Sequence, residues 1–194
     1  WATVAGQKAF LIRVSFAGEL GWEIHAENEY MPPIYDAVLA AGAKPFGMYA
    51  LDSLRIEKGY RAWKGDLSTD YSLLEGGLER FVKLDKPFDF TGKAAIQNEK
   101  QQGRKRAFVT LIVDSDFADA PYMSTIWNGD KVVGETTSGA WGFRVNASVA
   151  LGMVQVDLAE PGTELEVEIF GKRCKAVVQK DEPLWDPTNE RIRA

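Results

Sequence analysis

Residues 10–26 read FLIRVSFAGELGWEIHA, two apolar runs on either side of a polar segment that contains glycine. The runs Phe10–Phe16 and Gly21–Ala26 have the alternation and the β-branched and aromatic residues that are typical of strands. Ala17–Leu20 supplies a four-residue turn between them. The stretch therefore predicts a β-hairpin near the start of the chain.

The hairpin places a carboxylate, Glu23, among apolar side chains. With a four-residue turn, Val14 pairs with Glu23, and Phe16 lies on the same face because side chains alternate along a strand. An ionised carboxylate in such surroundings needs hydrogen-bond donors. The flat two-donor edge of a pterin would supply them, with Phe16 packed on the ring. An exposed strand position, or an ion pair with Arg13 or Arg61, would explain Glu23 without a ligand.

Two helices are expected after the hairpin. The first has Asn28 as its cap and prolines in its first turn, and it stops at Gly42. The second runs over Met48–Lys58 and is followed by a glycine. Arg55 and Glu57 lie in this second helix, where a solvated face or an ion pair from helix to loop is the default arrangement.

Residues 60–78 have no sustained period and predict an ordered loop, a kind of segment that often carries function. Its first part combines the rings of Tyr60 and Trp63 with the charge of Arg61. This mixture suits a ligand that is aromatic at one end and anionic at the other. The alternative is a surface loop that its rings fasten to the core.

Beyond the loop, Phe81–Leu84 predicts a short strand, and Thr91 is expected to cap a helix that ends near Gln102. From Ala107 onward the chain reads as strands separated by turns, which predicts a small antiparallel barrel. The segment TSGAWG, residues 137–142, is interpreted as a Gly-rich turn of that barrel, with a contact to the first domain as a further role. The expected strand-bearing stretches are AFVTLIV, STIWNGDKVVGETTS, SVALGMVQV and TELEVEIFGKRCKAVVQK.

These elements predict an α+β protein, with an α/β part over residues 1–103 and an all-β part over residues 104–194. The composition, 45% hydrophobic and 26% charged with a net charge of −5, is that of a folded globular chain. No basic face and no long apolar run are visible, so neither nucleic acid nor a membrane is an expected partner. A single cysteine and a single histidine predict no metal site. The chain begins Trp-Ala-Thr, which we interpret as a fragment of a longer protein.

Three motifs together resemble the aminomethyltransferase family, the folate-binding T-protein of glycine cleavage and its relatives. They are FAGELGWE at residues 16–23, DSLRIEKG at residues 52–59 and GDL at residues 65–67. The resemblance spans nearly the whole chain. It implies that the first part is the C-terminal half of a T-protein-like folate-binding domain, and that tetrahydrofolate is the cofactor.

Within the family, three segments look most like the C-terminal half of dimethylglycine and sarcosine dehydrogenases or oxidases. They are LRIEKGYRAW at residues 54–63, SLLEGGLERFVKLDK at residues 72–86 and EPLWDPTNERIRA at residues 182–194. The resemblance implies an N-terminal remainder of the same polypeptide that carries FAD and oxidises an N-methyl amine. The one-carbon unit would pass to tetrahydrofolate and give 5,10-methylenetetrahydrofolate.

The resemblance also implies the site residues. Glu23 matches the glutamate that binds the pterin, and Phe16 takes the position of a pocket tyrosine whose hydroxyl it lacks. Tyr60, Arg61 and Trp63 would help to enclose the ring or the tail. The family's catalytic aspartate belongs to preceding sequence, so no catalytic residue is expected in this chain.

One departure from the family concerns the tail of folate, because Leu51 stands where the glycine-cleavage branch has an arginine. Two other functions fit the same residues. One is a demethylase that passes a methyl group directly to tetrahydrofolate, and the other is a non-catalytic folate-fold module for assembly or regulation. The expected location is the cytoplasm, or the mitochondrial matrix if the source is eukaryotic.

Overall fold

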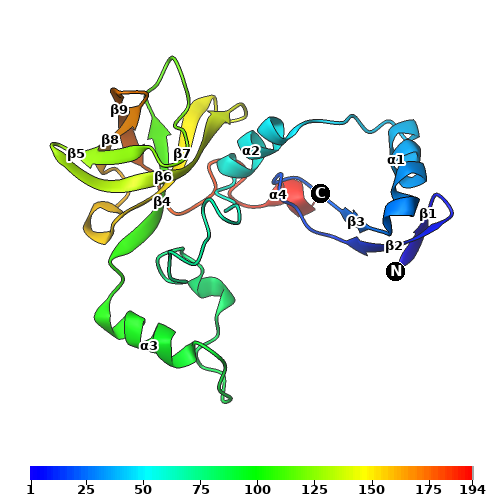
Figure 1. The fold of residues 1–194 in the computed structure, drawn as a ribbon, viewed down its shortest axis with the longest axis horizontal. Coiled ribbons are helices and arrows are strands. Elements are labelled where there is room, and N and C mark those ends of the chain that lie inside the picture. Colours follow the sequence, from blue (N-terminus) through cyan, green and yellow to red (C-terminus); the bar gives the residue numbers. More distant parts are fainter. Residues whose placement is uncertain (194) are drawn as a thin grey trace.

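The structure, a computed structural model, describes residues 1–193. A closed barrel and a small three-stranded sheet lie at opposite ends of the molecule, with α2 and the C-terminal α4 between them (Figure 1). A third region, which carries α3, projects away from both. No helix within residues 1–193 is long and apolar enough to cross a membrane.

The first sheet is antiparallel, in the order β1-β2-β3, with strands Ala2–Val4, Gln7–Ile12 and Glu23–His25. The predicted pair of Val14 and Glu23 is wrong, because Glu23 pairs with Ile12. The connecting loop is therefore ten residues, 13–22, instead of four.

A local turn within residues 13–22 makes the two strands shorter than predicted. Ser15 Oγ accepts a hydrogen bond from the Gly18 amide at 3.0 Å, and Gly18 has φ +76°, a left-handed conformation that favours glycine. The register differs from the expected one by two residues. A shift of two leaves each side chain on its predicted face, so Glu23 still shares a face with Ile12 and Phe10.

Both predicted helices of the first part form. A 3-10 turn, Asn28–Tyr30, leads into α1, Met31–Ala40, and α2 spans Met48–Glu57. Asn28 is not the cap: it lies within the 3-10 turn, whose last residue, Tyr30, occupies the capping position of α1 without a side-chain bond. The prolines do lie in the first turn of α1, where their missing N–H groups leave no helical hydrogen bond unmade.

The segment before the barrel differs from the prediction in two details. Phe81–Leu84 is no strand, because the amides of Phe81 and Val82 bond back to the carbonyls of Leu78 and Glu79 and form a 3-10 turn, Glu79–Phe81. The expected helix is α3, Lys93–Gln102. Its cap is Gly92 at φ +92° instead of Thr91, since the chain enters the helix through a left-handed residue.

The second part is the predicted antiparallel barrel. It is closed, with strand order β4-β7-β6-β5-β8-β9. Every second residue of β4 and β8 is buried, as the alternation of side chains in a barrel requires. A 3-10 turn, Val156–Leu158, follows β7, and α4, Glu190–Arg193, follows the barrel. The strands are Arg106–Val113 (β4), Thr125–Asn128 (β5), Lys131–Gly142 (β6), Ala147–Gln155 (β7), Glu164–Ile169 (β8) and Lys172–Val178 (β9).

Residues 137–142 are the end of strand β6 and not a turn. The first of their two glycines has a packing role, since a Cβ atom built on Gly139 would stand 2.1 Å from the carbonyl oxygen of Ala120. The missing side chain thus lets the segment that contains Ala120 cross directly over the strand. A contact with the first domain, the other role expected for this stretch, is present, since Ser53 Oγ donates to the Trp141 carbonyl at 2.6 Å.

The Gly139→Ala substitution should lower the free energy of unfolding of the barrel by about 1–3 kcal/mol, because the new methyl group must displace backbone. Urea unfolding followed by far-UV circular dichroism would measure the change. At Gly47 nothing lies within 4 Å of an added Cβ atom. Gly47→Ala is therefore the control, with an expected change below about 1 kcal/mol. Equal transitions for Gly139→Ala and the unmodified protein would contradict this account.

Candidate functional site

A pocket of about 250 Å³ opens where three loops meet beside α2. It brings together three of the five residues predicted to bind a ligand, Phe16, Tyr60 and Arg61. The rings of Phe16 and Tyr60 stack with their centroids 6.4 Å apart and their planes 11° from parallel. The full lining is Ser15, Phe16, Gly59, Tyr60, Arg61, Leu67, Leu78, Arg80 and Phe81.

The other two predicted residues, Glu23 and Trp63, do not line this pocket. Glu23 is on β3 with 55% of its side chain exposed, and its Oε2 lies 3.0 Å from Nε2 of His25. The exposed strand position is therefore the arrangement found, while Arg13 donates to the Ile192 carbonyl instead. Trp63 is 70% exposed. The sequence could have predicted the contact of Glu23 with His25, because residues two apart on a strand lie on the same face.

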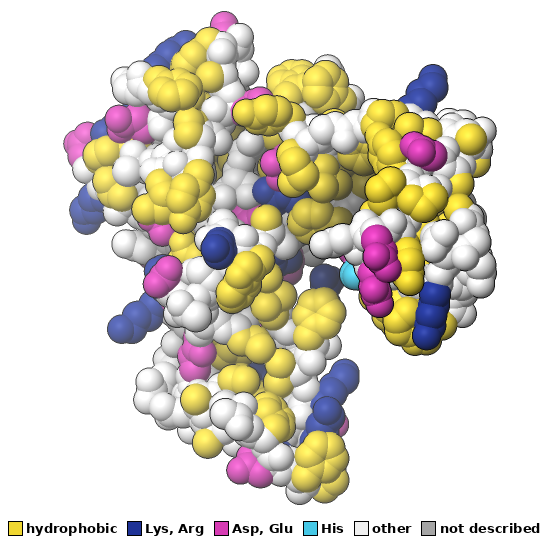
Figure 2. Space-filling view, turned by 45° about the vertical axis from the view of Figure 1, so that its right-hand side comes forward, with side chains coloured by type: hydrophobic (Ala, Val, Ile, Leu, Met, Phe, Trp, Pro, Cys, Tyr) yellow, Lys and Arg dark blue, Asp and Glu magenta, His cyan; other side chains and the backbone are white. Residues whose placement is uncertain are grey.

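The face of the sheet that carries Glu23 is apolar around it. Figure 2 shows hydrophobic side chains on the right-hand part of the molecule, among acidic and basic ones, with the single histidine visible at its margin. Residues that share the face of Glu23 line a hollow of about 400 Å³, among them Phe10, Ile12 and His25. Glu23 thus stands at the edge of an open apolar surface.

Arg61 is held rigidly at the pocket. Its guanidinium carbon lies 4.0 Å from the centroid of the Phe108 ring, and Nη1 donates to the Gly59 carbonyl at 3.4 Å. Its Nε is buried and has no hydrogen-bond partner within residues 1–193. Burial lowers the pKa of Arg61, and burial likewise raises the pKa of the Tyr60 hydroxyl, which therefore remains a hydrogen-bond donor at neutral pH.

Beneath the pocket, the loop is fixed to helix α2 and to the barrel by Asp66, whose side chain is fully buried. Asp66 accepts hydrogen bonds from Arg55 Nη1 at 2.9 Å and from the amide of Ala62 at 2.8 Å. The hydroxyls of Thr137 and Ser138 on β6 donate to it as well. Of the two expectations for Arg55, the ion pair from helix to loop is correct and the solvated face is wrong.

Arg55 links this cluster to the aromatic pair. It is 5% exposed, and besides Asp66 it donates to Asp52 at 2.8 Å and to Ser138 Oγ at 2.8 Å. Its guanidinium carbon also lies 5.9 Å from the centre of the Phe16 ring. A cation over a ring face is attracted to it, so Arg55 contributes to placing Phe16 at the pocket.

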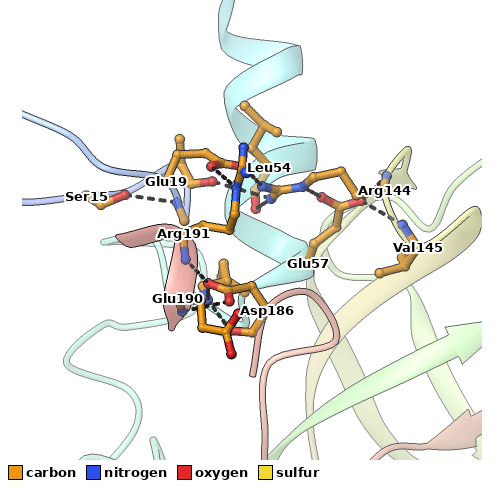
Figure 3. A network of polar contacts seen from close by, with 12 residues as sticks. Ser15, Glu19, Leu54, Glu57, Arg144, Val145, Asp186, Glu190 and Arg191 are labelled. Carbon is orange, nitrogen blue, oxygen red and sulfur yellow. Dashed lines mark hydrogen bonds and ion pairs between the residues drawn. The ribbon is translucent and has the colours of Figure 1, made fainter. Parts of the chain in front are cut away.

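A second buried carboxylate, Glu57, anchors the other side of α2 (Figure 3). It accepts hydrogen bonds from the amides of Arg144 and Val145, at 2.6 and 3.2 Å, and an ion pair from the Arg144 side chain. Arg144 also reaches the carboxylate of Glu19 at 3.0 Å and the carbonyl of Ala17 at 3.3 Å. The network thus joins the helix and the barrel to the loop that carries Phe16.

The C-terminal segment closes the same network. Lys58 Nζ is buried and donates to the carbonyl and the carboxylate of Asp186, at 2.7 and 3.1 Å. The amide of Trp185 bonds to the Glu57 carbonyl at 3.0 Å, and Arg191 pairs with Glu19 at 3.1 Å. Figure 3 shows Arg191 beside Glu19 and Arg144. No local pattern could have revealed these contacts, because Lys58 and Asp186 are 128 residues apart.

The pocket can bind a flat, anionic molecule, since it offers two stacked rings, a hydroxyl donor and two guanidinium groups. Within residues 1–193 no group of three histidine, cysteine, aspartate or glutamate side chains could hold a metal ion. The pocket lining contains no carboxylate, thiol or imidazole that could act as a base or a nucleophile. The rings, the hydroxyls and the guanidinium groups that line it suit the binding and orientation of a ligand.

Two family models match the chain. Residues 1–86 match the GCVT N-terminal domain, and residues 106–186 match the glycine cleavage T-protein C-terminal barrel domain. The crystal structure of the glycine cleavage system aminomethyltransferase T from Bartonella henselae superimposes with a TM-score of 0.82 at 26% identity. That superposition covers 92% of this chain and 50% of the other, which confirms the predicted fold class.

Two relatives are longer proteins. The mitochondrial dimethylglycine dehydrogenase of Homo sapiens is 43% identical over 94% of this chain. The mitochondrial sarcosine dehydrogenase of Mus musculus is 36% identical over 97% of it. The chain spans about a fifth of the length of each dehydrogenase, 22% in both cases. By its two domains, its relatives and its fold, the chain belongs to the aminomethyltransferase family, the glycine cleavage T-protein and its relatives.

Proposed function

We propose that this chain is the folate-binding part of a longer enzyme of the dimethylglycine or sarcosine dehydrogenase type. In that enzyme it helps to transfer a one-carbon unit to tetrahydrofolate. The observation that carries the proposal is the pocket where Phe16, Tyr60 and Arg61 meet, within a chain 43% identical to a dimethylglycine dehydrogenase. The preceding part of the same polypeptide supplies the catalytic residue and the FAD, and residues 1–103 form the part of the folate domain that lies in this chain.

The residues of the chain suit the two ends of a pterin. The carboxylate of Glu23 has His25 as its hydrogen-bond partner within residues 1–193, and a carboxylate can accept about four bonds. It therefore keeps capacity for the 2-amino and N3–H donors of the ring. Phe16 and Tyr60 offer a stacked aromatic surface, and Arg61 lines the same pocket. Trp63, two residues further along the loop and exposed, would have to turn toward the ligand to enclose it.

Tetrahydrofolate, when bound, supplies the nitrogen nucleophiles that accept the one-carbon unit. The chain's own residues bind it, orient it and exclude water from it. The FAD that would oxidise the amine belongs to the proposed preceding part, since this chain has no Gly-x-Gly-x-x-Gly segment. Because two relatives are named mitochondrial, we place the enzyme in the mitochondrial matrix if its source is eukaryotic.

Glu23→Gln in the full-length enzyme should weaken tetrahydrofolate binding about tenfold or more, the effect of losing a charge-assisted hydrogen bond of roughly 1.5–3 kcal/mol. Isothermal titration calorimetry would measure the dissociation constant. Glu29→Gln is the matched control, because Glu29 is an exposed carboxylate on the neighbouring 3-10 turn. Equal affinities for the Glu23→Gln variant and the unmodified enzyme would remove Glu23 from the site.

A further inference from the structure

We propose that Arg61 and Arg80 together bind a carboxylate of the glutamate tail of tetrahydrofolate. This inference rests on the proposed function and deepens it, because it assigns one end of the pocket to one end of the ligand. Arg80 belongs to the 3-10 turn Glu79–Phe81 and stands outside every motif that the sequence singled out for binding. The structure alone places it in the pocket with Arg61.

The two arginines approach the pocket from different segments. Arg61 comes from the loop after α2, packed on Phe108, and Arg80 comes from the turn before α3 and is exposed. Within residues 1–193 neither side chain forms an ion pair, and Nε of Arg61 is buried without a hydrogen-bond partner. A desolvated guanidinium without a carboxylate is costly, so an anion bound here would be stabilised.

The charges around the pocket also favour the binding of an anion. Burial is the main cause that lowers the pKa of Arg61, and the neighbouring positive charge of Arg80 lowers it further. The nearest acidic influences are Asp181, Asp66 and Glu79, none of which lines the pocket. Two cations therefore meet in a space that lacks an acidic side chain, and a planar guanidinium matches a carboxylate with two parallel hydrogen bonds.

The order of groups along the site matches the order of groups in folate. Glu23 lies opposite Ile12 in the sheet, and the chain runs on from Ile12 to Phe16. Four residues of chain span at most about 13 Å, which limits how far Phe16 can lie from Ile12, the partner of Glu23. A ligand held at its pterin by Glu23 would pass the rings of Phe16 and Tyr60. Its carboxylates would then reach the two arginines.

The test compares three probes on the full-length enzyme by calorimetry: tetrahydrofolate, 6-methyltetrahydropterin, which has no tail, and p-aminobenzoyl-glutamate, which has no pterin. Arg80→Met keeps the apolar stem and removes the charge. It should weaken tetrahydrofolate and p-aminobenzoyl-glutamate about tenfold, the range of a charge-assisted bond. The affinity for 6-methyltetrahydropterin should stay unchanged. Arg173→Met, on β9 of the barrel, is the matched control.

A loss that is equal for tetrahydrofolate and 6-methyltetrahydropterin, or no loss for either, would overturn the assignment. Arg61→Lys adds a second measurement, since it keeps the charge and removes the paired donors, and it should also weaken only the probes with a tail. If the enzyme bound no tetrahydrofolate at all, the proposed function would fail. Binding of p-aminobenzoyl-glutamate with and without Arg80 would then decide the arginine pair on its own.

Discussion

Asp66→Ala is expected to lower the free energy of unfolding of the protein by about 3–5 kcal/mol, the usual loss when one partner of a buried ion pair is removed. Asp66 is 0% exposed and Arg55 is 5% exposed. Within residues 1–193 the substitution leaves the buried Arg55 guanidinium with Asp52 as its one carboxylate partner, and the side chain of Asp52 is 41% exposed. It also removes the acceptor for the hydroxyls of Thr137 and Ser138, which lie on the barrel strand β6.

The measurement is chemical denaturation followed by tryptophan fluorescence and circular dichroism. Asp70→Ala is the matched control, because it removes an exposed carboxylate from the same loop, and its change should stay within about 0.5 kcal/mol. Asp66→Asn should fall between the two, since an amide keeps one acceptor oxygen and loses the charge. The prediction is wrong if Asp66→Ala and Asp70→Ala unfold at the same denaturant concentration.

Asp66 also determines where the ligand-binding part of its loop lies. Its Oδ2 accepts a hydrogen bond from the amide of Ala62 at 2.8 Å, and Ala62 stands between Arg61 and Trp63 in the sequence. Without this bond the loop loses one of the hydrogen bonds that fix Ala62, the residue next to Arg61. We therefore expect the Michaelis constant for tetrahydrofolate to rise in the Asp66→Ala variant even at temperatures where the protein remains folded.

The barrel could be predicted from the sequence because its signals are local. Alternation of period two along β4 and β8 marks the buried face of each strand, and the Asn128-Gly129 pair marks the turn between β5 and β6. Helix α1 was likewise indicated by its prolines and its terminal glycine. Each of these elements follows from residues within a few positions of one another.

The sequence left two arrangements open for Arg55 and Glu57 of α2, a solvated face and an ion pair from helix to loop, and it did not identify their partners. The buried residues of the helix include Ser53, Arg55 and Glu57 beside the apolar Ile56. Charged side chains in a surface helix usually lie on its solvated face, so their burial here is not expected from the sequence pattern. Apart from Asp52 and the Tyr60 carbonyl, which are near Arg55 in sequence, their partners lie 11 to 88 residues further along the chain. The tertiary structure is therefore needed to show that the charges are compensated.

Three of the five predicted binding residues lie in the candidate pocket, and Glu23 and Trp63 do not. Phe16, Tyr60 and Arg61 were expected to act together, and the structure places them in one pocket. Glu23 lies apart from it on the sheet, because the loop before it is ten residues and not four. A hydrogen bond from a glycine amide to Ser15 sets that loop length, and neither residue type alone specifies it.

Arg144→Met is the second substitution with a large expected effect. It should lower the free energy of unfolding by about 3–5 kcal/mol, because it leaves the buried carboxylate of Glu57 without its ion-pair partner. The side chain of Glu57 is 0% exposed and that of Arg144 is 14% exposed. Among the described residues, 1–193, the backbone amides of Arg144 and Val145 would be the donors that remain to Glu57 after the substitution. Methionine keeps much of the apolar stem, so the loss reports the missing charge and its hydrogen bonds.

The control is Arg191→Met in the same network. Arg191 is 61% exposed and pairs with Glu19, which is 37% exposed. A surface pair of this kind contributes about 0–1 kcal/mol, so its removal should hardly move the unfolding transition. A large effect of Arg191→Met, or a small effect of Arg144→Met, would show that burial of Glu57 does not control the strength of this network.

A double variant, Glu57→Gln with Arg144→Met, distinguishes two free energies. One is the penalty of leaving the Glu57 charge buried without a partner, and the other is the net contribution of the ion pair to stability. Neutralising both partners removes the buried charge, so the double variant should be more stable than Arg144→Met alone, with a coupling energy above about 1 kcal/mol. Arg144 also donates to the Ala17 carbonyl and to Glu19, in the loop of residues 13–22 that carries Phe16 at the pocket. The double variant should therefore recover stability without recovering affinity for tetrahydrofolate. Recovery of both would mean that Arg144 stabilises the fold without positioning the site.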